Sequence, residues 1–155
     1  MKKYKESFST ILGRLQLSIK KNNLKTSKQR EFVLKAIYDD GGHLSPEDIF
    51  AIIKKTCKNA SVSSIYRILA FLEKEGFVSS IEVDKTGKRY EIAGGSHHDH
   101  IICVECGKIE EFYNDEIEKL QIKVTKERDF KLVGHDMLLY AVCKDCLKTS
   151  KQNAN

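Results

Sequence analysis

The sequence predicts an α+β protein built from two domains. Three features of the chain support this fold class: helical patterns precede the first strand patterns, two strand patterns then follow in close succession, and two Cys-x-x-Cys pairs lie in the second half. The small residues Gly94–Ser96 separate these two regions. We therefore expect one domain over residues 1–92, a hinge over 93–96 and a smaller α/β domain over 97–155.

Four segments of the first domain carry apolar residues at the spacing of an amphipathic helix. Ser45 and Pro46 supply a hydroxyl cap followed by proline at the first helical position, which is typical of a helix start. Gly76 can end a helix by adopting the left-handed conformation. The expected helices run from Phe8 to about Lys21, from Thr26 or Ser27 to Gly41, from Ser45 to about Cys57, and from Ser61 to Gly76.

A β-hairpin is expected directly after the fourth helix. Residues 77–83 and 88–92 are strand-like, and the segment 84–87 between them contains a glycine. Helices followed by a hairpin predict a winged helix-turn-helix, a fold in which the start of one helix enters the major groove of DNA. The candidate DNA contacts are Ser61, Ser63, Ser64, Tyr66 and Arg67 at the start of the fourth helix, and Lys85, Lys88 and Arg89 on the hairpin. For Tyr66 and Arg67, an ordinary surface role is the alternative.

The net charge is distributed unevenly along the chain. Residues 1–92 carry 18 Lys/Arg and 11 Asp/Glu, whereas residues 93–155 carry 9 and 11, which gives net charges of +7 and −2. A basic region attracts the phosphate backbone, so the first domain is expected to bind nucleic acid, with an ordinary solvated surface as the alternative. The longest apolar run, 137–143, is far shorter than a bilayer span, and no signal-peptide core follows the first lysines. We therefore expect a cytoplasmic protein that does not contact membranes.

Four of the five cysteines form two Cys-x-x-Cys pairs, at 103–106 and 143–146. Such pairs are typical of a tetrahedral structural zinc site, which here would tie together segments separated by 36 residues. The alternative is a pair of redox-active dithiols, but a thioredoxin-type motif would open a helix in a βαβ setting. Cys57 has no partner at chelating distance in the sequence, so we expect a buried or incidental thiol.

Residues 97–100 read His-His-Asp-His and contain three of the five histidines. If this segment is a strand, alternation sends His98 and His100 to one face and His97 with Asp99 to the other. Each face could form a metal site with carboxylates or histidines from elsewhere; candidates are Glu91, Glu111, Glu118, His43 and His135. Nitrogen and oxygen donors suit Fe²⁺, Mn²⁺, Co²⁺ or Zn²⁺ and bind them more reversibly than four thiolates do. The alternative is a solvated polar turn.

The second domain is expected to contain both strands and a helix. The strands are expected at 98–103, 109–112 and 131–143, the helix at 115–128, and a polar, frayed tail from Leu147. Ile117, Leu120 and Val124 form one apolar stripe on the helix, and residues 132–142 offer a strand edge. These two features predict a homodimer, with a tetramer as an open alternative.

The chain resembles the ferric uptake regulator family over nearly its whole length. The resemblance is carried by Leu24-Lys25-Thr26 with Gln29-Arg30, by Ser64–Arg67, by His97–His100 and by the two Cys-x-x-Cys pairs. It implies a homodimeric repressor of iron-uptake and iron-homeostasis genes that binds an AT-rich palindromic operator when Fe²⁺ is abundant.

The resemblance also implies a role for individual residues. It implies a regulatory Fe²⁺ site of His43, Glu91, His98, His100 and Glu111, where Mn²⁺, Co²⁺ or Zn²⁺ can substitute; an additional metal site of His97, Asp99, Glu118 and His135; a structural zinc on Cys103, Cys106, Cys143 and Cys146; and DNA contacts by Lys25, Tyr66 and Arg67. Zinc-sensing and peroxide-sensing members are alternatives. Peroxide sensors place aspartates where this chain has Glu91 and Glu111, which favours the iron-type regulator.

Two other classes of protein compete with this interpretation. A non-haem iron oxygenase or metallohydrolase could use the histidine cluster, but the chain has no cosubstrate motif or nucleophile–base pair, so we expect no enzyme. A zinc-storage or redox-thiol protein without DNA activity would leave the basic first domain unexplained. A gel shift on promoter DNA separates this second class from a DNA-binding regulator.

Overall fold

The computed structural model describes residues 4, 6–83 and 87–152. The chain divides into two compact units, residues 1–96 and residues 97–155, which we call the amino-terminal and carboxyl-terminal units. The division falls at the end of the predicted hinge, 93–96. Bending at that hinge stays a prediction.

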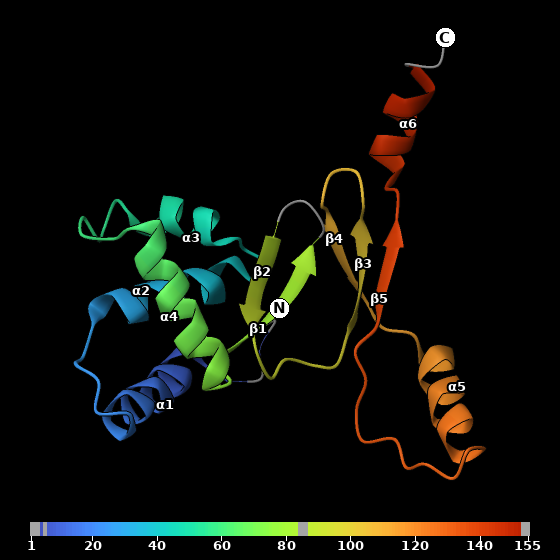
Figure 1. Ribbon diagram of the computed structural model, residues 1–155, viewed down its shortest axis with the longest axis horizontal. Helices are drawn as coiled ribbons and strands as arrows, with labels where there is room; N and C mark the ends of the chain where they lie inside the picture. The colour runs from blue at the N-terminus through green and yellow to red at the C-terminus, as the bar shows by residue number, and fades with distance from the viewer. Residues whose placement is uncertain (1–3, 5, 84–86, 153–155) are drawn as a thin grey trace. The chain divides into compact units, whose positions relative to one another are not determined.

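The amino-terminal unit contains four helices followed by a two-stranded antiparallel hairpin (Figure 1). Its elements are α1 (Phe8–Lys21), α2 (Lys28–Asp40), α3 (Pro46–Ile53), α4 (Val62–Lys74), β1 (Val78–Val83) and β2 (Gly87–Ile92). Val78 pairs with Ile92 at the open end of the hairpin and Val83 with Gly87 at the other. The predicted winged-helix order is therefore confirmed. Across the described residues, every helix is too short or too polar to cross a bilayer.

Local capping interactions determine where α3 and α4 begin. The hydroxyl of Ser45 accepts the N–H of Asp48, whose carboxylate in turn accepts the N–H of Ser45. Ser61 and Ser64 form the same reciprocal pair at the start of α4. Because each pair satisfies N–H groups that have no acceptor within the helix, the two starts are held firmly. At the other end of α4, Gly76 takes φ = 72°, the left-handed conformation that was expected of it.

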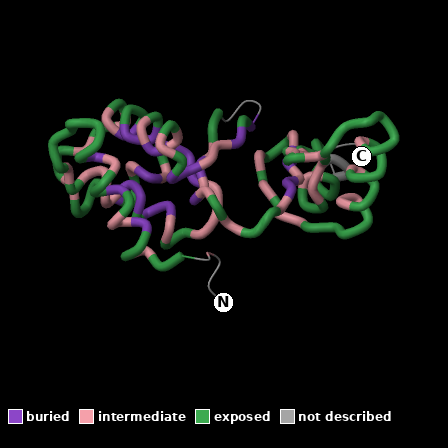
Figure 2. The backbone as a smooth tube through the Cα atoms, turned by 90° about the horizontal axis from the view of Figure 1, so that it is seen from below, coloured by how far each residue is buried: buried purple, intermediate pink, exposed green. Residues whose placement is uncertain are grey.

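One hydrophobic core holds the amino-terminal unit together. Leu15 of α1, Leu34 of α2, Ile49 of α3 and Leu69 of α4 are all fully buried in it. Tyr90 of β2 also packs into this cluster, so the hairpin is attached to the helices. Figure 2 shows that the buried segments concentrate in this unit. The shared core therefore fixes α4 relative to α2 and α3.

The carboxyl-terminal unit is a three-stranded sheet with two helices. Its elements are β3 (Asp99–Cys103), β4 (Ile109–Phe112), α5 (Asp115–Lys126), β5 (Leu138–Ala141) and α6 (Lys144–Gln152). The strand order is β4-β3-β5, with β4 antiparallel and β5 parallel to the central β3. The central position of β3 places residues 99–103 between both neighbours. This segment carries three of the predicted metal ligands, Asp99, His100 and Cys103.

Two expectations for the end of the chain are wrong. The strand expected over 131–143 is confined to Leu138–Ala141, because only these four residues pair with β3. The tail expected to fray from Leu147 is instead part of helix α6, in which the Leu147 N–H bonds to the Cys143 carbonyl. Sequence pattern indicates that a segment can form a strand, but pairing decides where the strand exists.

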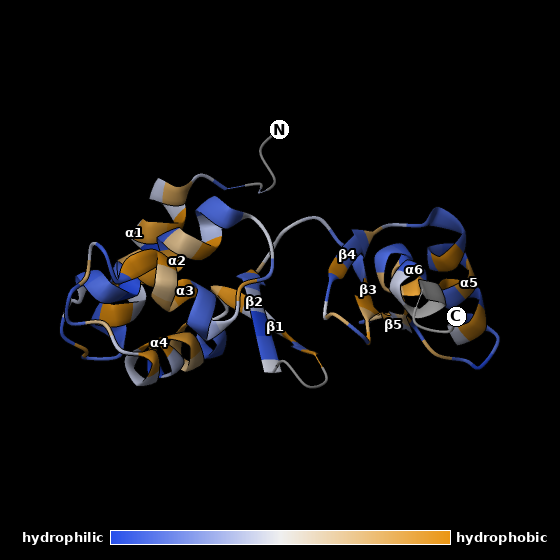
Figure 3. Cartoon of the chain, turned by 90° about the horizontal axis from the view of Figure 1, so that it is seen from above, coloured by the Kyte–Doolittle hydropathy of each residue, from blue (hydrophilic) through white to orange (hydrophobic). Residues whose placement is uncertain are grey.

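Much apolar surface of the carboxyl-terminal unit is uncovered. No side chain of α5 is buried, and Leu120 and Val124 are about half exposed. Tyr140 on β5 and Phe130 ahead of it are also exposed. Figure 3 shows hydrophobic residues on β5 and along part of α5. Exposed apolar patches of this kind mark a surface that binds another molecule.

The buried face of α4 can be tested with a truncation. We expect Leu69→Ala to lower the free energy of unfolding of the amino-terminal unit by about 2–5 kcal/mol, because Leu69 is fully buried and its loss leaves a cavity. Urea unfolding followed by circular dichroism measures the change. Leu17→Ala is the control, since Leu17 is 70% exposed and its truncation should alter stability by less than about 0.5 kcal/mol. Equal losses in both variants would contradict this core.

Candidate metal centres and nucleic-acid interface

The four paired cysteines meet in the carboxyl-terminal unit. Cys103 is the last residue of β3, and Cys106 lies in the turn that leads to β4. Cys143 directly precedes α6, and Cys146 lies in its first turn. All four sulfur atoms lie within 4.8 Å of one another. The fold therefore joins two segments that the sequence separates by 36 residues.

The geometry of this thiol cluster fits a tetrahedral ion. The Cys103 and Cys146 sulfur atoms are 3.9 Å apart, and those of Cys106 and Cys143 are 3.8 Å apart. Four sulfurs at the usual Zn–S distance of about 2.3 Å would be separated by about 3.8 Å. A disulfide would instead need about 2.05 Å, and all four thiols are free.

Backbone groups prepare the Cys103 sulfur to carry negative charge. The N–H of Cys143 donates to it at 3.3 Å. This bond, with a second from the Cys106 N–H, lowers the pKa of the Cys103 thiol to about 6. Because the thiolate is the metal-binding form, these hydrogen bonds favour ligation.

One feature of the second pair also occurs in redox-active dithiols. Cys143 and Cys146 do open a helix, α6, as the pair does in a thioredoxin-type motif. The surrounding sheet is nevertheless β4-β3-β5, and the other pair of thiols lies against this one. Four converging sulfurs fit a metal ion better than two separate dithiols.

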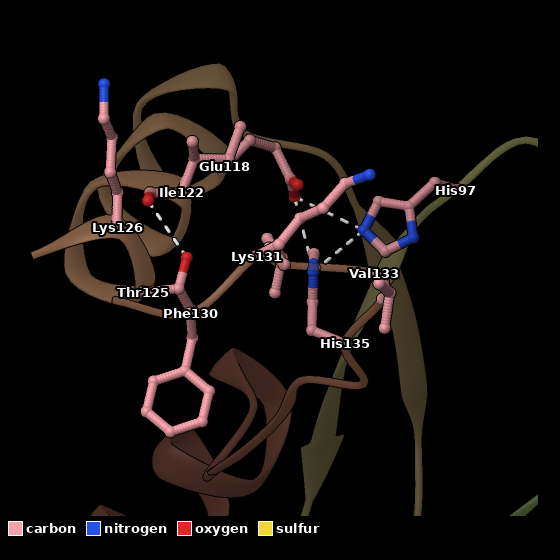
Figure 4. Close-up of a pocket in the computed structure, with 11 residues that line it drawn as sticks. His97, Glu118, Ile122, Thr125, Lys126, Phe130, Lys131, Val133 and His135 are labelled. Atoms are coloured by element: carbon pink, nitrogen blue, oxygen red, sulfur yellow. Dashed lines mark hydrogen bonds and ion pairs between the residues drawn. The ribbon is translucent and has the colours of Figure 1, made fainter. Parts of the chain in front are cut away.

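A second cluster of potential ligands comes from three elements of the same unit. Asp99 lies on β3, two residues after His97; Glu118 comes from α5, and His135 from the segment before β5. Figure 4 shows the imidazoles of His97 and His135 close to the Glu118 carboxylate. Strand alternation grouped His97 with Asp99, and the family resemblance implied Glu118 and His135 as their partners. The structure brings the ligand atoms of all four within 4.8 Å of one another.

The distances in this cluster are those of ligands around a small cation. The two imidazole Nε2 atoms are 2.9 Å apart, and Glu118 Oε1 lies 3.3 Å from His97 Nε2 and 3.5 Å from His135 Nε2. Donors placed tetrahedrally at about 2.0–2.1 Å from an ion would be about 3.4 Å apart. Asp99 is 1% exposed, and among the described residues neither of its carboxylate oxygens accepts a hydrogen bond, although His135 Nε2 lies 3.3 Å from Oδ1. A bound cation would neutralise this otherwise costly buried carboxylate.

Each unit also contributes one further group of predicted ligands. In the amino-terminal unit, His43 Nε2 lies 3.4 Å from Glu91 Oε2, and Ser79 donates to the other oxygen of Glu91 at 3.2 Å. In the carboxyl-terminal unit, the rings of His98 and His100 lie 4.7 Å apart. Glu111 lies opposite His100 in the β3–β4 ladder. Residues that were expected to act together thus form a pair on one unit and a trio of neighbours on the other.

The start of α4 holds most of the predicted base-reading residues. The Ser64 hydroxyl accepts from Gln29 and donates to the Ser61 carbonyl, and Ser61 caps the helix. The two serines are therefore used within the protein, and their contact with DNA stays a prediction. Tyr66 is 48% exposed and donates to Glu47 at 3.2 Å. Partial desolvation and then the Glu47 carboxylate raise the pKa of Tyr66, so its hydroxyl remains protonated.

The residues that were predicted to contact the DNA backbone differ in how many interactions they make within the protein. Arg89 forms an ion pair with Asp48 at 2.9 Å, and Lys88 lies 3.5 Å from Glu73. Lys85 lies outside the described residues. Lys25 is exposed in the segment before α2. Its carbonyl accepts a hydrogen bond from Arg30, which fixes that segment at the base of α2.

The contacts that several residues make in this region were not predicted from the sequence. Asp48 caps α3 and also pairs with Arg89, and its pKa is lowered, first by the hydrogen bond from the Ser45 side chain. Glu47 accepts from Tyr66, and Gln29 links α2 to α4. The Ser-Pro-Glu-Asp start of α3 gave a capping signal, but the contacts to Tyr66 and Arg89 span 19 and 41 residues and have no local pattern.

Known proteins resemble this chain in both sequence and structure. The sequence pattern of the Ferric uptake regulator family matches residues 21–140. The ferric uptake regulation protein of Helicobacter pylori is 55% identical over 141 residues, which cover 91% of this chain and 94% of that protein. That of Campylobacter jejuni is 43% identical over 141 residues and 90% of each chain.

Two solved structures extend the comparison to three dimensions. The ferric uptake regulator of Helicobacter pylori, described as having three functional metal-binding sites, has a TM-score of 0.90 at 54% identity and covers 95% of this chain and 97% of that one. A ferric uptake regulator of Francisella tularensis, solved with iron, has a TM-score of 0.73 at 33% identity, with 80% of this chain and 95% of that one covered. The family match, residues 21–140, extends over most of both units. The chain belongs to the ferric uptake regulator family.

Proposed function

We propose that this protein is a metal-responsive repressor that binds double-stranded DNA, with Fe²⁺ as its regulatory metal. One observation carries the proposal: β3, at the centre of the carboxyl-terminal unit, lies beside ligands of two kinds, histidine–carboxylate and thiolate. The amino-terminal unit is a winged helix with its own histidine–carboxylate pair. A protein with ligands on both a DNA-binding fold and a second unit can couple metal binding to DNA binding.

The thiol cluster is the structural metal site in this proposal. Zinc on Cys103, Cys106, Cys143 and Cys146 would join the end of β3 to the start of α6 permanently. The cluster of His97, Asp99, Glu118 and His135 would hold an additional ion and attach α5 to the sheet. Both sites lie within one unit, so they support the fold and do not by themselves transmit a signal to DNA.

The regulatory site combines ligands of both units. A metal ion bound by His43, Glu91, His98, His100 and Glu111 would restrict the position of the winged helix relative to the carboxyl-terminal unit. In a dimer, this restriction favours the spacing at which both α4 helices fit successive major grooves. Metal affinity and DNA affinity are then linked reciprocally, typically by about 5- to 150-fold.

The ligand chemistry favours Fe²⁺ and leaves other divalent ions able to bind. Three imidazoles with two carboxylates suit Fe²⁺, Mn²⁺, Co²⁺ and Zn²⁺, and supply in the cell contributes to the choice among them. Related structures contain iron in the Francisella tularensis protein and manganese in the Pseudomonas aeruginosa protein. A manganese uptake regulator has been solved with zinc. Zinc and peroxide sensing by this chain are the alternatives.

The DNA target is an AT-rich palindrome, and the genes controlled are those of iron uptake and iron homeostasis. Tyr66 and Arg67 at the start of α4 would meet base edges, and Lys25 would approach the minor groove. Lys85, Lys88, Arg89 and the serines 61 and 64 would contact the backbone. The net charge of +7 over residues 1–92 supports this assignment.

The palindrome matches a homodimer formed through the carboxyl-terminal unit. Ile117, Leu120 and Val124 follow one face of α5, and the last two are exposed. The edge strand β5 is exposed along all four residues and has an unpaired side. A second copy would cover both, and a tetramer remains an alternative.

The first test of the function is DNA affinity as a function of free metal. An AT-rich palindrome is titrated at fixed salt with Fe²⁺, Mn²⁺ or Zn²⁺, and the thiolate-bound metal is left in place. We expect Fe²⁺, and Mn²⁺ as its surrogate, to increase affinity by at least about 5-fold. A response to Zn²⁺ alone would identify a zinc sensor, and no DNA binding under any condition would refute the proposed function.

The assignment of the regulatory ligands predicts a specific loss. His98→Ala and His100→Ala should each abolish most of the metal-dependent gain in DNA affinity while the protein still dimerises, because each removes one imidazole from the bridging set. His97→Ala is the matched control, since His97 belongs to the cluster with Glu118 and His135. Undiminished metal dependence in both His98 and His100 variants would rule out this ligand set.

Removal of the structural metal should act on stability instead. Cys103→Ser should lower the bound zinc by about one ion per chain and lower the melting temperature, because three remaining thiolates hold the ion poorly. Metal analysis and calorimetry measure both effects. Cys57→Ser is the control, as Cys57 lies in the other unit. Full zinc content and unchanged melting in Cys103→Ser would contradict the structural role.

A further inference from the structure

A small pocket of about 250 Å³ lies between the start of α2 and the first half of α4. It is lined mainly by polar and cationic side chains over an aromatic wall. The lining residues used below are Ser27, Gln29, Arg30, Ser64, Arg67 and Phe71. We call it the α2 pocket. Its lining residues all belong to the amino-terminal unit, and it is separate from the metal clusters.

The α2 pocket concentrates positive charge. Two guanidinium groups, of Arg30 and Arg67, line it, and none of the described residues that line it is an Asp or a Glu. Arg30 stacks on the Phe71 ring at 5.5 Å, and its Nη1 donates to the Lys25 carbonyl at 2.8 Å. Its Nε is buried and has no hydrogen-bond partner among the described residues. A buried guanidinium N–H without an acceptor indicates that an acceptor comes from outside the chain.

The start of α2 adds further donors beside the same pocket. Ser27 is the N-cap residue of α2, yet its hydroxyl makes no capping hydrogen bond. The Arg30 N–H bonds to the Ser27 carbonyl, but the opening N–H groups of a helix have no acceptor within it. The positive end of the helix dipole also lies there. The starts of α3 and α4, in contrast, are closed by reciprocal serine caps.

The α2 pocket is rigidly connected to the helix that would read DNA. Gln29 donates to the Ser64 hydroxyl at 2.6 Å, and Ser64 belongs to the cap of α4. An anion held in the pocket would therefore be fixed relative to Tyr66 and Arg67. In protein–DNA complexes, backbone phosphates fix the register of the protein and base contacts supply specificity.

We propose that the α2 pocket binds one phosphodiester of the DNA backbone and thereby sets the depth and register of α4. Arg30, the Ser27 hydroxyl and the opening N–H groups of α2 hold the phosphate, and Arg67 closes the pocket from the side of α4. This inference rests on the proposed function, because it takes DNA as the source of the phosphate. Ser27 and Arg30 thereby join the DNA-contacting residues.

The test measures the salt dependence of DNA binding at one saturating metal concentration. Removing a phosphate contact lowers the slope of log affinity against log salt by about 1. We expect this change in Arg30→Gln, together with a loss of affinity of roughly 10-fold or more that is the same for the operator and for operators with single base changes. Lys35→Gln is the matched control, since Lys35 is on the same helix but pairs with Asp39.

A second variant separates phosphate binding from folding. Arg30 also holds the Lys25 carbonyl, so Arg30→Gln can disturb the segment before α2. Ser27→Ala leaves every charge in place and removes a hydroxyl that caps nothing. We expect it to lower DNA affinity by a few-fold without a change in the salt slope or melting temperature. If both variants bind DNA like Lys35→Gln, the proposal is wrong.

Binding of inorganic phosphate tests the α2 pocket without DNA. Phosphate titrated into the wild-type protein should shift the NMR signal of the Arg30 Nε–H, and Arg30→Gln should abolish binding. A shift without any effect of the variants on DNA affinity would identify a free-phosphate site and overturn the DNA assignment. DNA binding that does not depend on metal would refute the proposed regulation. The salt dependence of the variants would still test whether the α2 pocket binds a DNA phosphate.

Discussion

The carboxyl-terminal unit depends on the meeting of four cysteine sulfur atoms. They lie within 4.8 Å of one another and join the end of β3 to the start of α6. Ile102 and Cys103 are its only buried apolar residues among those described, and α5 buries no side chain. So little apolar burial contributes little stability on its own. An ion on the thiols and a second copy against α5 and β5 would supply what the core does not.

The amino-terminal unit, in contrast, is stabilised by its own hydrophobic core. Side chains of all four helices and of the hairpin pack into one cluster, and reciprocal serine caps hold the starts of α3 and α4. A unit stabilised by its own core can keep the reading helix in shape whether or not metal is bound. In the proposed regulation, metal would then change where this helix lies and not whether it is folded.

Side chains alternate between the two faces of a strand, so neighbouring residues of 97–100 belong to different groups of candidate metal ligands. His97 and Asp99 face Glu118 and His135, whereas the rings of His98 and His100 lie 4.7 Å apart. One short segment thus contributes ligands to one cluster within the carboxyl-terminal unit and holds a second pair of histidines for the proposed regulatory site. Asp99 is buried and accepts no hydrogen bond from the part of the chain that the structure describes, so a cation is needed most at the cluster that contains it.

The sequence by itself determined the elements whose signals are local. Apolar spacing and the caps at Ser45 and Ser61 located α1 to α4, the glycine-containing turn located the hairpin, and the Cys-x-x-Cys spacing indicated a metal site. Only the tertiary structure decided that β5 is four residues long and that α6 follows it, because a strand exists only where β3 can pair with it. It also decided that Ser64 bonds to Gln29 and that Asp48 pairs with Arg89. These contacts join residues far apart in the chain, and no periodicity or propensity encodes them.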